Sequence, residues 1–549
     1  MAEPFHSGGL SPEVLAIASA AIGKSPAGVR IRRVGAALSG ATGQSARDGL
    51  GIWIAQFVPA EMLVPDVYKR WRPVVRDAIQ FLFSRLSTER LAAKIVEQVD
   101  LPIDTPGPAR LLRLISKMPG IQKVGQVLAR HHRLDEEVRK ALSELENGMS
   151  DSAPRAIRAI LSRQLGARLR TYAVRFETRI FSEASVSAVI RFTWRNPETK
   201  LREHGVCKVL KPYVREYFRE DLSLLQHLSE FLAHGRGYGF ATRHIAEMVS
   251  EVRLLLEHEL DFTREQATLS DAAGTYRISP GVRVPRLIAP LSTPEITAMS
   301  EESGTKITGV FPERRYLRRR VAEQLVEALV AVPLLSRDSE VVFHADPHAG
   351  NLLYDERTGS IALLDWALTE RLSRELRRQI ALLVIMTVLR NAGAVSQTLQ
   401  RLASAPDRHD PGKIQIIRRR VEQFFHDLPY NRAAGSLDAM QLLDEIALEG
   451  VHFPAALAMF QKALFTLDGV LRDIAGSEVS ISYLIVRDFA IRLMVSFGLD
   501  HPPLSAADLV AVQRSGLLYP TRWGASALRG LASKSASEAN GPAALESSS

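Results

Sequence analysis

The sequence predicts an α+β protein with two parts, one rich in strands and one rich in helices, and with further helices at its N-terminal end. Between residues 174 and 210, short runs of β-branched and aromatic residues are separated by turn-forming residues, which is typical of strands. After residue 315, apolar residues recur mostly at helical spacing, interrupted by a hairpin signal near residue 355. A chain of 549 residues is long enough for more than one domain.

Composition narrows the class of protein. Apolar residues make up 46% and charged residues 24%, which is typical of a globular chain. The formal net charge of +9 is modest for this length, so it favours anionic partners such as nucleotides or acidic lipid surfaces and does not indicate nucleic-acid binding. Cys207 is the only cysteine, which excludes an intrachain disulfide and a multi-cysteine zinc site and fits a reducing compartment.

The two ends of the chain carry no targeting or membrane signal. The first residues lack a basic segment followed by an apolar one, so we expect no signal peptide. No apolar run approaches the roughly 18 residues that a transmembrane helix needs. We therefore expect a cytoplasmic protein whose membrane contact, if any, is peripheral to the inner face. Residues 501–549 form a C-terminal segment that ends in a disordered Ala-, Ser- and Gly-rich tail. The oligomeric state is not indicated.

Helical periodicity defines most of the remaining segments. Residues 1–110 are expected to form a helical extension, with helices at Trp71–Leu86 and Glu89–Val99. Residues 111–170 continue as helices, among them Asp135–Glu146. The C-terminal helices are expected at Arg315–Leu335, Arg371–Leu399, Ile414–Phe425 and Phe453–Arg472.

The strand-rich segment contains a loop suited to phosphate binding. Strands Val174–Phe181 and Val189–Trp194 flank a turn of small residues, and Gly205–Leu210 forms a third strand. Small residues let backbone amides approach phosphate oxygens, as the Gly-rich loop of kinases does. We expect this contact from Ala184, Ser185, Val186 and Ser187.

Lys208 lies among apolar residues of the third strand, where burial is costly unless the ammonium group is paired. Phosphoryl-transfer enzymes place such a lysine on the nucleotide phosphates and pair it with a glutamate of a helix. Candidate partners lie in the acidic helix Glu251–Gln266. Spacing alone does not decide which glutamate pairs with Lys208, and these charges could also form a solvated face.

A hairpin at residues 343–370 carries polar residues at both ends. Asp346 and Asn351 precede its first apolar run, and Asp365 follows its second run, after a turn that contains Gly359. One carboxylate to orient the attacking group, with an amide and a second carboxylate to hold a metal, suits phosphoryl transfer. A zinc site at His344 and His348 is the rival hypothesis, but Pro347 disfavours the helix it needs. A third interpretation is a polar loop without chemistry.

This hairpin resembles that of the UbiB (ADCK-type) family of atypical kinases, whose loop reads close to HADPHPGN. The resemblance implies a two-lobed protein-kinase-like fold, with a small antiparallel-sheet N-lobe and inserted helices at 171–300 and a helical C-lobe at 301–500. It makes Asp346 a catalytic residue and Asn351 and Asp365 ligands of Mg²⁺ beside bound ATP. Asp365-Trp366-Ala367 replaces the usual Asp-Phe-Gly, which removes a residue with easy access to positive φ. Aminoglycoside-type phosphotransferases also use Asp-Trp here.

Further positions extend the resemblance. It makes Glu265 the catalytic partner of Lys208 and places Met299 and Glu301 at the adenine pocket. The chain departs from the family at Ala188, where Gln is usual, and at Ser300, where Glu is usual. The family's Lys-x-Gly-Gln motif and the acidic pair that faces it correspond to Lys123, Gly125, Gln126, Glu259 and Asp261.

The resemblance implies an ATP-dependent atypical kinase or ATPase that uses Mg²⁺, acts in ubiquinone or other isoprenoid-lipid metabolism, and meets an isoprenoid lipid or membrane surface as a partner. Two alternatives stay open. One is a nucleotide-binding scaffold with little turnover, which the departures from the family favour. The other is a small-molecule phosphotransferase of the aminoglycoside type, which the Asp-Trp pair permits.

Overall fold

The structure, a computed structural model, divides into two compact units. The first comprises residues 1–265 and 287–301, and the second comprises residues 266–286 and 302–549. The residues that it describes are 12–40, 43–64, 66–102, 104–122, 152–184, 186–234, 238, 253, 256–277, 279–309, 314–429, 431–476, 481, 484–485, 487 and 504–524. The sequence-based boundary at residue 300 lies close to the end of the first unit, but residues 266–286 belong to the second unit.

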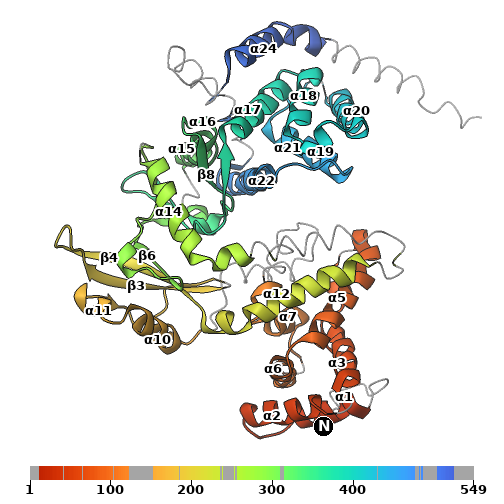
Figure 1. Cartoon of the computed structure of the whole chain (residues 1–549), viewed down its shortest axis with the longest axis vertical. Helices are drawn as coiled ribbons and strands as arrows, with labels where there is room; N and C mark the ends of the chain where they lie inside the picture. Colours follow the sequence, from red (N-terminus) through yellow and green to blue (C-terminus); the bar gives the residue numbers. More distant parts are fainter. Residues whose placement is uncertain are drawn as a thin grey trace, which may run out of the picture. The chain divides into compact units, whose positions relative to one another are not determined.

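The first unit begins with helices that share a hydrophobic core with a later helix, α12 (Pro212–Ala233). Figure 1 shows α12 beside the N-terminal helix α5. Leu91 and Ile95 of α6 and Leu225 of α12 are among the buried members of this core. The predicted helices at 71–86 and 89–99 are confirmed as α5 and α6. The N-terminal elements are α1 (Pro12–Ala21), α2 (Ala27–Leu38), α3 (Gly43–Phe57), α4 (Ala60–Leu63), η1 (Asp66–Trp71), α5 (Arg72–Arg85), α6 (Thr88–Val99) and α7 (Gly107–Ile115).

A buried ion pair fastens α6 to α12. Arg90 Nη1 lies 2.7 Å from Asp221 Oδ1, and the two side chains are 4% and 2% exposed. The backbone N–H of Gly120 donates to the other carboxylate oxygen of Asp221 over 3.0 Å. Burial raises the pKa of Asp221, while Arg90 and the Gly120 amide act in the opposite direction. The segment after α7 is therefore held to α12 by the same carboxylate.

The sheet of the first unit is antiparallel throughout. Its order is β1-β3-β4-β6, with β2 paired to β3. Helix α10 (Pro154–Leu165) covers one face, where Ile157 and Leu161 pack in the same core as Ile190 and Cys207. The elements are β1 (Arg175–Phe176), β2 (Ser182–Glu183), β3 (Ser187–Arg195), β4 (Arg202–Leu210) and β6 (Ile296–Ser300), with the short helices α11 (Arg168–Thr171) and η2 (Ala289–Leu291).

The predicted strand 174–181 is wrong over most of its length. The backbone N–H of Glu177 donates to Arg191 O, and that of Phe181 donates to Val189 O. Between these two bonds the edge segment advances by four residues while β3 advances by two. The edge segment therefore bends away from β3 at residues 178–179. Such a bulge divides the edge into the short strands β1 and β2, because only they stay in register with β3.

In the second unit, the predicted hairpin is confirmed. β9 (Leu352–Asp355) pairs antiparallel with β10 (Ser360–Leu363), and Gly359 in the turn has φ +66°. β5 (Val282–Arg283) adds parallel to β10, and β7 (Thr305–Lys306) adds antiparallel to β9. A second, two-stranded sheet pairs β8 (Glu340–His344) with β11 (Thr369–Ser373). The pairing of β9 with β10 fixes the hairpin, and the pairing of β8 with β11 fixes the start of the loop before it.

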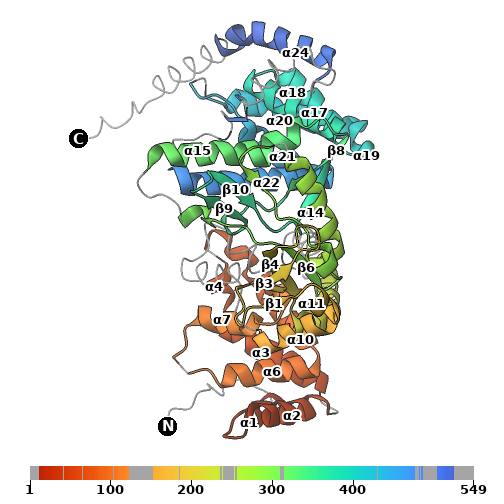
Figure 2. The same ribbon diagram turned by 90° about the vertical axis from the view of Figure 1, so that its left-hand side faces the viewer.

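Helices make up the rest of the second unit. Figure 2 shows α15 and α22 beside the β9–β10 hairpin, and α15 contacts both α22 and β10. The elements are α15 (Arg315–Val326), which continues through a π-helical turn (Glu327–Ala331) into α16 (Val332–Leu335), then α17 (Arg374–Val388), α18 (Ala392–Leu402), α19 (Ala405–Arg408), α20 (Pro411–Asp427), α21 (Ser436–Leu448), α22 (Ala455–Ala475) and α24 (Ala506–Leu517), with the 3₁₀ turns η3 (Ile307–Gly309) and η5 (Ala349–Asn351).

The prediction of one helix over 371–399 is wrong at two places. Its first residues belong to β11, which pairs with β8. The helix also stops after Val388, where Arg390 has φ +49° and the Asn391 side chain caps α18 by accepting from Ala394 N–H. Many side chains of α17 are buried, and the resulting apolar pattern gives no clear sign of where the helix ends.

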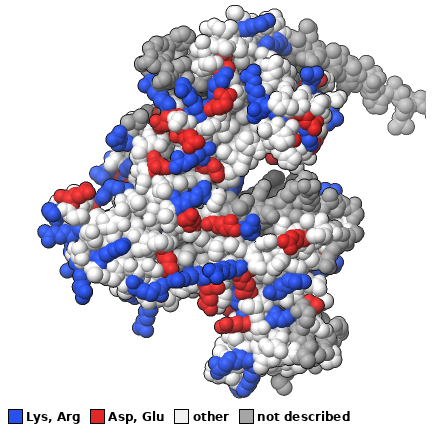
Figure 3. Space-filling model, in the orientation of Figure 1, with Lys and Arg blue, Asp and Glu red and all other residues white. Residues whose placement is uncertain are grey.

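These elements confirm the predicted α+β class, with a small antiparallel sheet in one unit and mostly helices in the other. No helix in the described part of the chain is long and apolar enough to cross a membrane. Lys and Arg side chains are interspersed with Asp and Glu over the face shown in Figure 3, in keeping with the modest net charge.

Candidate functional site

The first group of candidate residues lies on β4 and the start of α14 (Phe262–Tyr276). Lys208 Nζ lies 2.7 Å from Glu265 Oε1, and the side chains are 9% and 2% exposed. The other carboxylate oxygen of Glu265 accepts a hydrogen bond from Thr297 Oγ1 over 3.4 Å. Thr297 stands opposite Lys208 in the β4–β6 register, so the strand pair supplies both partners of Glu265.

Strand alternation explains why Lys208 points toward α14. Its neighbours Cys207 and Val209 are buried in the core that contains α10, so Lys208 projects from the opposite face. The ring of Phe262, the first residue of α14, lies 5.7 Å from the Lys208 ammonium. Among the glutamates that the sequence left open, Glu265 contacts Lys208, whereas Glu257 pairs with Arg253 over 2.9 Å.

Asp261 fixes the position of Glu265 along the chain. Its carboxylate accepts a hydrogen bond from Arg264 N–H over 2.9 Å, and its carbonyl accepts from Glu265 N–H over 3.0 Å. This is an N-cap, which satisfies backbone donors at the start of α14. Glu259, the other member of the predicted acidic pair, is partly buried. The residues expected to face this pair, Lys123, Gly125 and Gln126, lie outside the described residues.

A loop of small residues joins β2 to β3, and we call residues 184–187 the small loop. Ala184 N–H donates to Ser187 O over 2.8 Å, which closes the turn. Ser187 is fully buried, and within the described part of the chain its hydroxyl has no hydrogen-bond partner. Ser187 is paired with Leu210 and Val189 with Lys208, so Ser187 projects from the same face of the sheet as Lys208. Val186 is buried, and Ser185 lies outside the described residues.

Met299 and Glu301, predicted to border an adenine pocket, lie at the end of β6. Met299 is half-buried and stands opposite Val206 in β4. Glu301 Oε1 lies 2.7 Å from Arg191 Nε of β3. Glu301 thus ties the end of β6 to the central strand of the sheet.

The second group lies in the second unit, in the loop between β8 and β9. The carbonyl of Asp346 accepts from the Asn351 side-chain amide over 3.2 Å and from His348 N–H over 2.8 Å. The Asp346 side chain is 12% exposed, with His348 Nε2 3.9 Å from its Oδ2. Asn351 is joined to the second strand of the hairpin by Leu364 N–H, which donates to its carbonyl over 2.8 Å. Hydrogen bonds within the loop and from the end of the second hairpin strand therefore hold Asp346 and Asn351 in place.

Both ring nitrogens of His344 have hydrogen-bond partners inside the protein, which argues against the zinc hypothesis. Nε2 donates to Leu364 O over 2.8 Å, and Nδ1 accepts from Asp346 N–H over 3.3 Å. Burial lowers the pKa of His344, a direction that favours the neutral imidazole. His344 ends β8 and His348 lies in a loop, so they do not share a helical face. Within the described ranges, no group of three or more His, Cys, Asp or Glu side chains is arranged to hold a metal ion.

The residue with a left-handed backbone in this segment is Asp365, and the loss of glycine at Ala367 is therefore tolerated. Asp365 has φ +53°, whereas Ala367 is not among the residues with positive φ. Aspartate tolerates the left-handed region better than most residues, so the position that needs it already has a suitable side chain. Asp365 Oδ1 also accepts from Ala367 N–H over 3.3 Å. The alanine in place of glycine therefore adds no left-handed strain.

Trp366 anchors Asp365 in this conformation. Its indole N–H donates to Leu363 O over 3.0 Å, and its carbonyl accepts from Thr268 Oγ1 over 2.9 Å. The ring is 1% exposed and lies edge-on to His344 with centroids 5.1 Å apart. Tyr276 packs on it at 5.9 Å. The tryptophan thus joins α14, β8 and the hairpin around Asp365.

Three contacts were missed from the sequence. The hydrogen bond from Thr297 to Glu265 could not be predicted, because threonine is common in strands. The indole anchor was not inferred, although Trp366 in an apolar run needs a partner for its N–H. Lys211, buried after β4, pairs with Glu183 over 3.0 Å. The cost of burying a lysine, which drew attention to Lys208, applies equally to Lys211.

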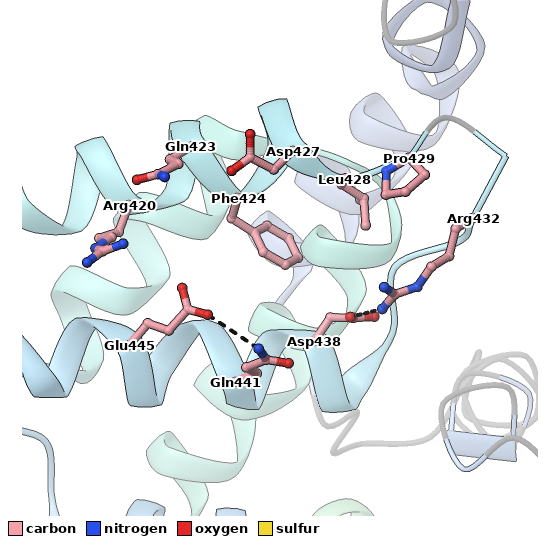
Figure 4. Close-up of a pocket in the computed structure, with 10 residues that line it drawn as sticks. All are labelled: Arg420, Gln423, Phe424, Asp427, Leu428, Pro429, Arg432, Asp438, Gln441 and Glu445. Atoms are coloured by element: carbon pink, nitrogen blue, oxygen red, sulfur yellow. Dashed lines mark hydrogen bonds and ion pairs between the residues drawn. The ribbon is translucent and has the colours of Figure 1, made fainter. Parts of the chain in front are cut away.

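A hollow of about 380 Å³ lies elsewhere in the second unit, between α20 and α21 (Figure 4). Phe424 and Leu428 supply apolar surface, and Arg432 turns toward Asp438 at one end. None of the candidate residues described above lines it. The chemistry predicted from the sequence is therefore not located in this hollow.

The site can be compared with known proteins. Residues 144–399 match the model of the ABC1 atypical kinase-like domain. Similar curated proteins include Protein ACTIVITY OF BC1 COMPLEX KINASE 7, chloroplastic, of Arabidopsis thaliana, at 26% identity over 64% of this chain and 50% of that one. Another is Probable protein kinase UbiB of Azotobacter vinelandii, at 29% identity over 46% of each chain. The chain thus spans about half the length of these two relatives.

A solved structure is also similar, the complex of Rv3197 with erythromycin from Mycobacterium tuberculosis, with a TM-score of 0.42 and 19% identity over 68% of this chain and 92% of that one. The family match begins before α10 and ends within α18, so it contains Lys208, Glu265, Asp346, Asn351 and Asp365. The resemblance to atypical kinases and the two-lobed kinase-like fold are confirmed. Residues 144–399, just under half of the chain, thus resemble the ABC1 atypical kinase-like domain.

Proposed function

We propose that the chain binds ATP with Mg²⁺ and works as a UbiB-type atypical kinase or ATPase. The observation that carries the proposal is the buried pair of Lys208 and Glu265, 2.7 Å apart. In kinases, such a pair between a strand lysine and a helix glutamate prepares the lysine to contact nucleotide phosphates. A buried pair contributes little net stability, so function is the better reason for keeping it here.

The small loop fits a nucleotide. The Ser187 hydroxyl is buried, projects from the same face of the sheet as Lys208, and has no partner in the described ranges. A buried hydroxyl left unpaired costs about 1–3 kcal/mol, which a phosphate oxygen would offset by accepting its hydrogen bond. Ala184 and Val186 would present backbone to the same phosphates, as Gly-rich loops do.

Asn351 and Asp365, at the two ends of the β9–β10 hairpin, would hold a magnesium ion. Asn351 and Asp365 offer the hard oxygen ligands that Mg²⁺ prefers, and both lie next to the backbone of the hairpin. Bound Mg²⁺ would supply positive charge to neutralise the phosphates. Asn351 keeps its amide nitrogen on Asp346 O, which leaves its carbonyl oxygen as the ligand atom.

Asp346 would orient the attacking hydroxyl or water and accept its proton. Hydrogen bonds to His348, Asn351 and the His344 imidazole hold the backbone of Asp346, from which this carboxylate projects. A base held in place before the substrate arrives loses less entropy on reaching the reactive geometry. The positioning residues therefore contribute to rate without touching the substrate.

The lipid part of the proposal rests on the resemblance alone. Relatives that carry the name UbiB suggest a role in ubiquinone or other isoprenoid-lipid metabolism, with an isoprenoid lipid or a membrane surface as the partner.

The test is hydrolysis of ATP by the full chain, with and without Mg²⁺ and with and without liposomes. We expect Mg²⁺-dependent phosphate release that falls at least about 100-fold in Asp346→Asn. Asp427→Asn, an exposed carboxylate of the second unit, is the matched control and should keep the wild-type rate. If wild type binds ATP but releases phosphate no faster than Asp346→Asn, the chain is a nucleotide-binding scaffold instead.

The second alternative is phosphorylation of a small hydroxylated molecule. The Asp365-Trp366 pair favours it, since phosphotransferases of the aminoglycoside type share that pair. A screen of hydroxylated small molecules as acceptors, followed by mass spectrometry, decides the point. A product heavier by one phosphoryl group that is absent with Asp346→Asn would favour this alternative over a lipid-directed ATPase.

A further inference from the structure

A second buried ion pair lies next to the small loop. Lys211 Nζ is 3.0 Å from Glu183 Oε2, and the two side chains are 1% and 5% exposed. Glu183 is the last residue of β2, directly before the small loop, and Lys211 directly follows β4. The pair therefore links the start of the loop to the strand that carries Lys208.

The backbone makes a second link at the same place. Lys211 N–H donates to Val186 O over 3.0 Å, and Ala184 N–H donates to Ser187 O over 2.8 Å. Lys211 thus holds the loop at two points, through its side chain at Glu183 and through its backbone at Val186. The ring of Tyr213 lies 5.8 Å from the Lys211 ammonium and covers it further.

The pair lies on the side of the sheet away from Lys208. Glu183 stands opposite Ala188, which is buried in the core that contains α10 and Val209. Ser187 and Lys208 project from the other face. The ion pair can therefore hold the loop while leaving free the face that the proposed nucleotide site uses.

We propose that Glu183 and Lys211 are positioning residues that clamp the small loop to β4, and so fix its backbone for the phosphates of a bound nucleotide. The clamp rests on the proposed function for its purpose and on the contacts above for its existence. Phosphate loops rich in glycine gain order on binding, which costs conformational entropy. A loop already clamped loses less, so the clamp raises affinity for nucleotide.

The test measures hydrogen exchange first, in the absence of nucleotide, for wild type, Lys211→Met and Glu183→Gln. The clamp predicts exchange at Ala184 and Lys211 at least about tenfold faster in both variants, with the central amides of β3 and β4 unchanged. Lys200→Met, an exposed lysine at the far end of the same hairpin, is the matched control and should exchange like wild type. Unchanged loop exchange in a folded variant overturns the clamp.

Calorimetric titration with MgATP then supplies the functional readout. We expect a Kd at least about tenfold higher in the two single variants, and a higher KM with kcat less affected, because the clamp positions the loop and does not touch the reacting atoms. Unchanged affinity with faster loop exchange overturns the positioning role. Absence of MgATP binding to wild type would instead refute the proposed function, and the exchange result would still decide whether the clamp exists.

A single variant could fail to fold, since it leaves one charge buried without its partner. The double variant Glu183→Leu/Lys211→Met removes both charges and is expected to regain stability. The Ala184 amide should still exchange faster than in wild type, because packing of the two apolar side chains does not fix the loop backbone as the ion pair does. Wild-type exchange in the double variant overturns the clamp.

Discussion

Replacing Trp366 by phenylalanine tests whether the indole anchor stabilises the hairpin. The change removes the N–H that reaches Leu363 O over 3.0 Å and leaves that buried carbonyl without this donor, at a cost of about 1–3 kcal/mol. It also removes part of a ring that is 1% exposed, which costs about 1–2 kcal/mol more through lost burial and the space left behind. We expect Trp366→Phe to lower the free energy of unfolding by about 2–4 kcal/mol.

The assay is urea unfolding followed by circular dichroism, with hydrogen exchange over residues 343–370 to locate the loss in the hairpin. Trp523→Phe is the matched control, because Trp523 is 44% exposed and its replacement should change the free energy of unfolding by less than about 0.5 kcal/mol. If Trp366→Phe and Trp523→Phe have equal effects, or if exchange in the hairpin is unchanged, the anchoring role of the indole is refuted.

Three further outcomes follow from the same contacts. Lys208→Ala should abolish turnover and weaken MgATP binding at least about tenfold, measured by phosphate release and calorimetry, and an unchanged rate would remove Lys208 from the site. Arg90→Met leaves Asp221 buried without its main partner, so we expect about 3–5 kcal/mol less stability in thermal or urea unfolding; a loss below about 1 kcal/mol would contradict the contact. The Ser303 hydroxyl, with backbone N–H groups of the turn, holds the pKa of Asp355 below its usual value. Because a depressed carboxyl pKa stabilises the fold above the unfolded value and this contribution is lost as pH falls, Asp355→Asn should flatten the loss of thermal stability between about pH 5 and pH 3, and parallel curves would argue against it.

Local signals predicted the hairpin well. Two short apolar runs, separated by the turn from Asp355 to Gly359, leave few ways to pair, and the observed register joins Ser360 to Asp355 and Leu363 to Leu352. Asp346, Asn351 and Asp365 were singled out because they flank those runs, and their roles stay predictions. The polar ends of the hairpin are therefore predictable from the order of residues alone.

Features that depend on neighbours distant in sequence could not be predicted. Spacing alone could not select Glu265 among several glutamates; the resemblance assigned it to Lys208, and the contact in the structure confirms that pairing. The bend at residues 178–179 depends on how the edge segment meets β3. The left-handed backbone at Asp365 depends on Trp366, whose partners Thr268 and His344 come from other elements. Propensity describes one segment at a time, so it carries none of this information.

Binding of ATP by the full chain is the most direct test of the account. Calorimetric titration with ATP in the presence of Mg²⁺ should give saturable, one-site binding to wild type that weakens at least about tenfold when Mg²⁺ is withheld or when Lys208 is replaced by methionine. Lys200→Met should bind as wild type does. Absence of binding at millimolar ATP, or binding that is indifferent to both Mg²⁺ and Lys208, would contradict the proposal that this chain uses Lys208, Asn351 and Asp365 to hold a nucleotide.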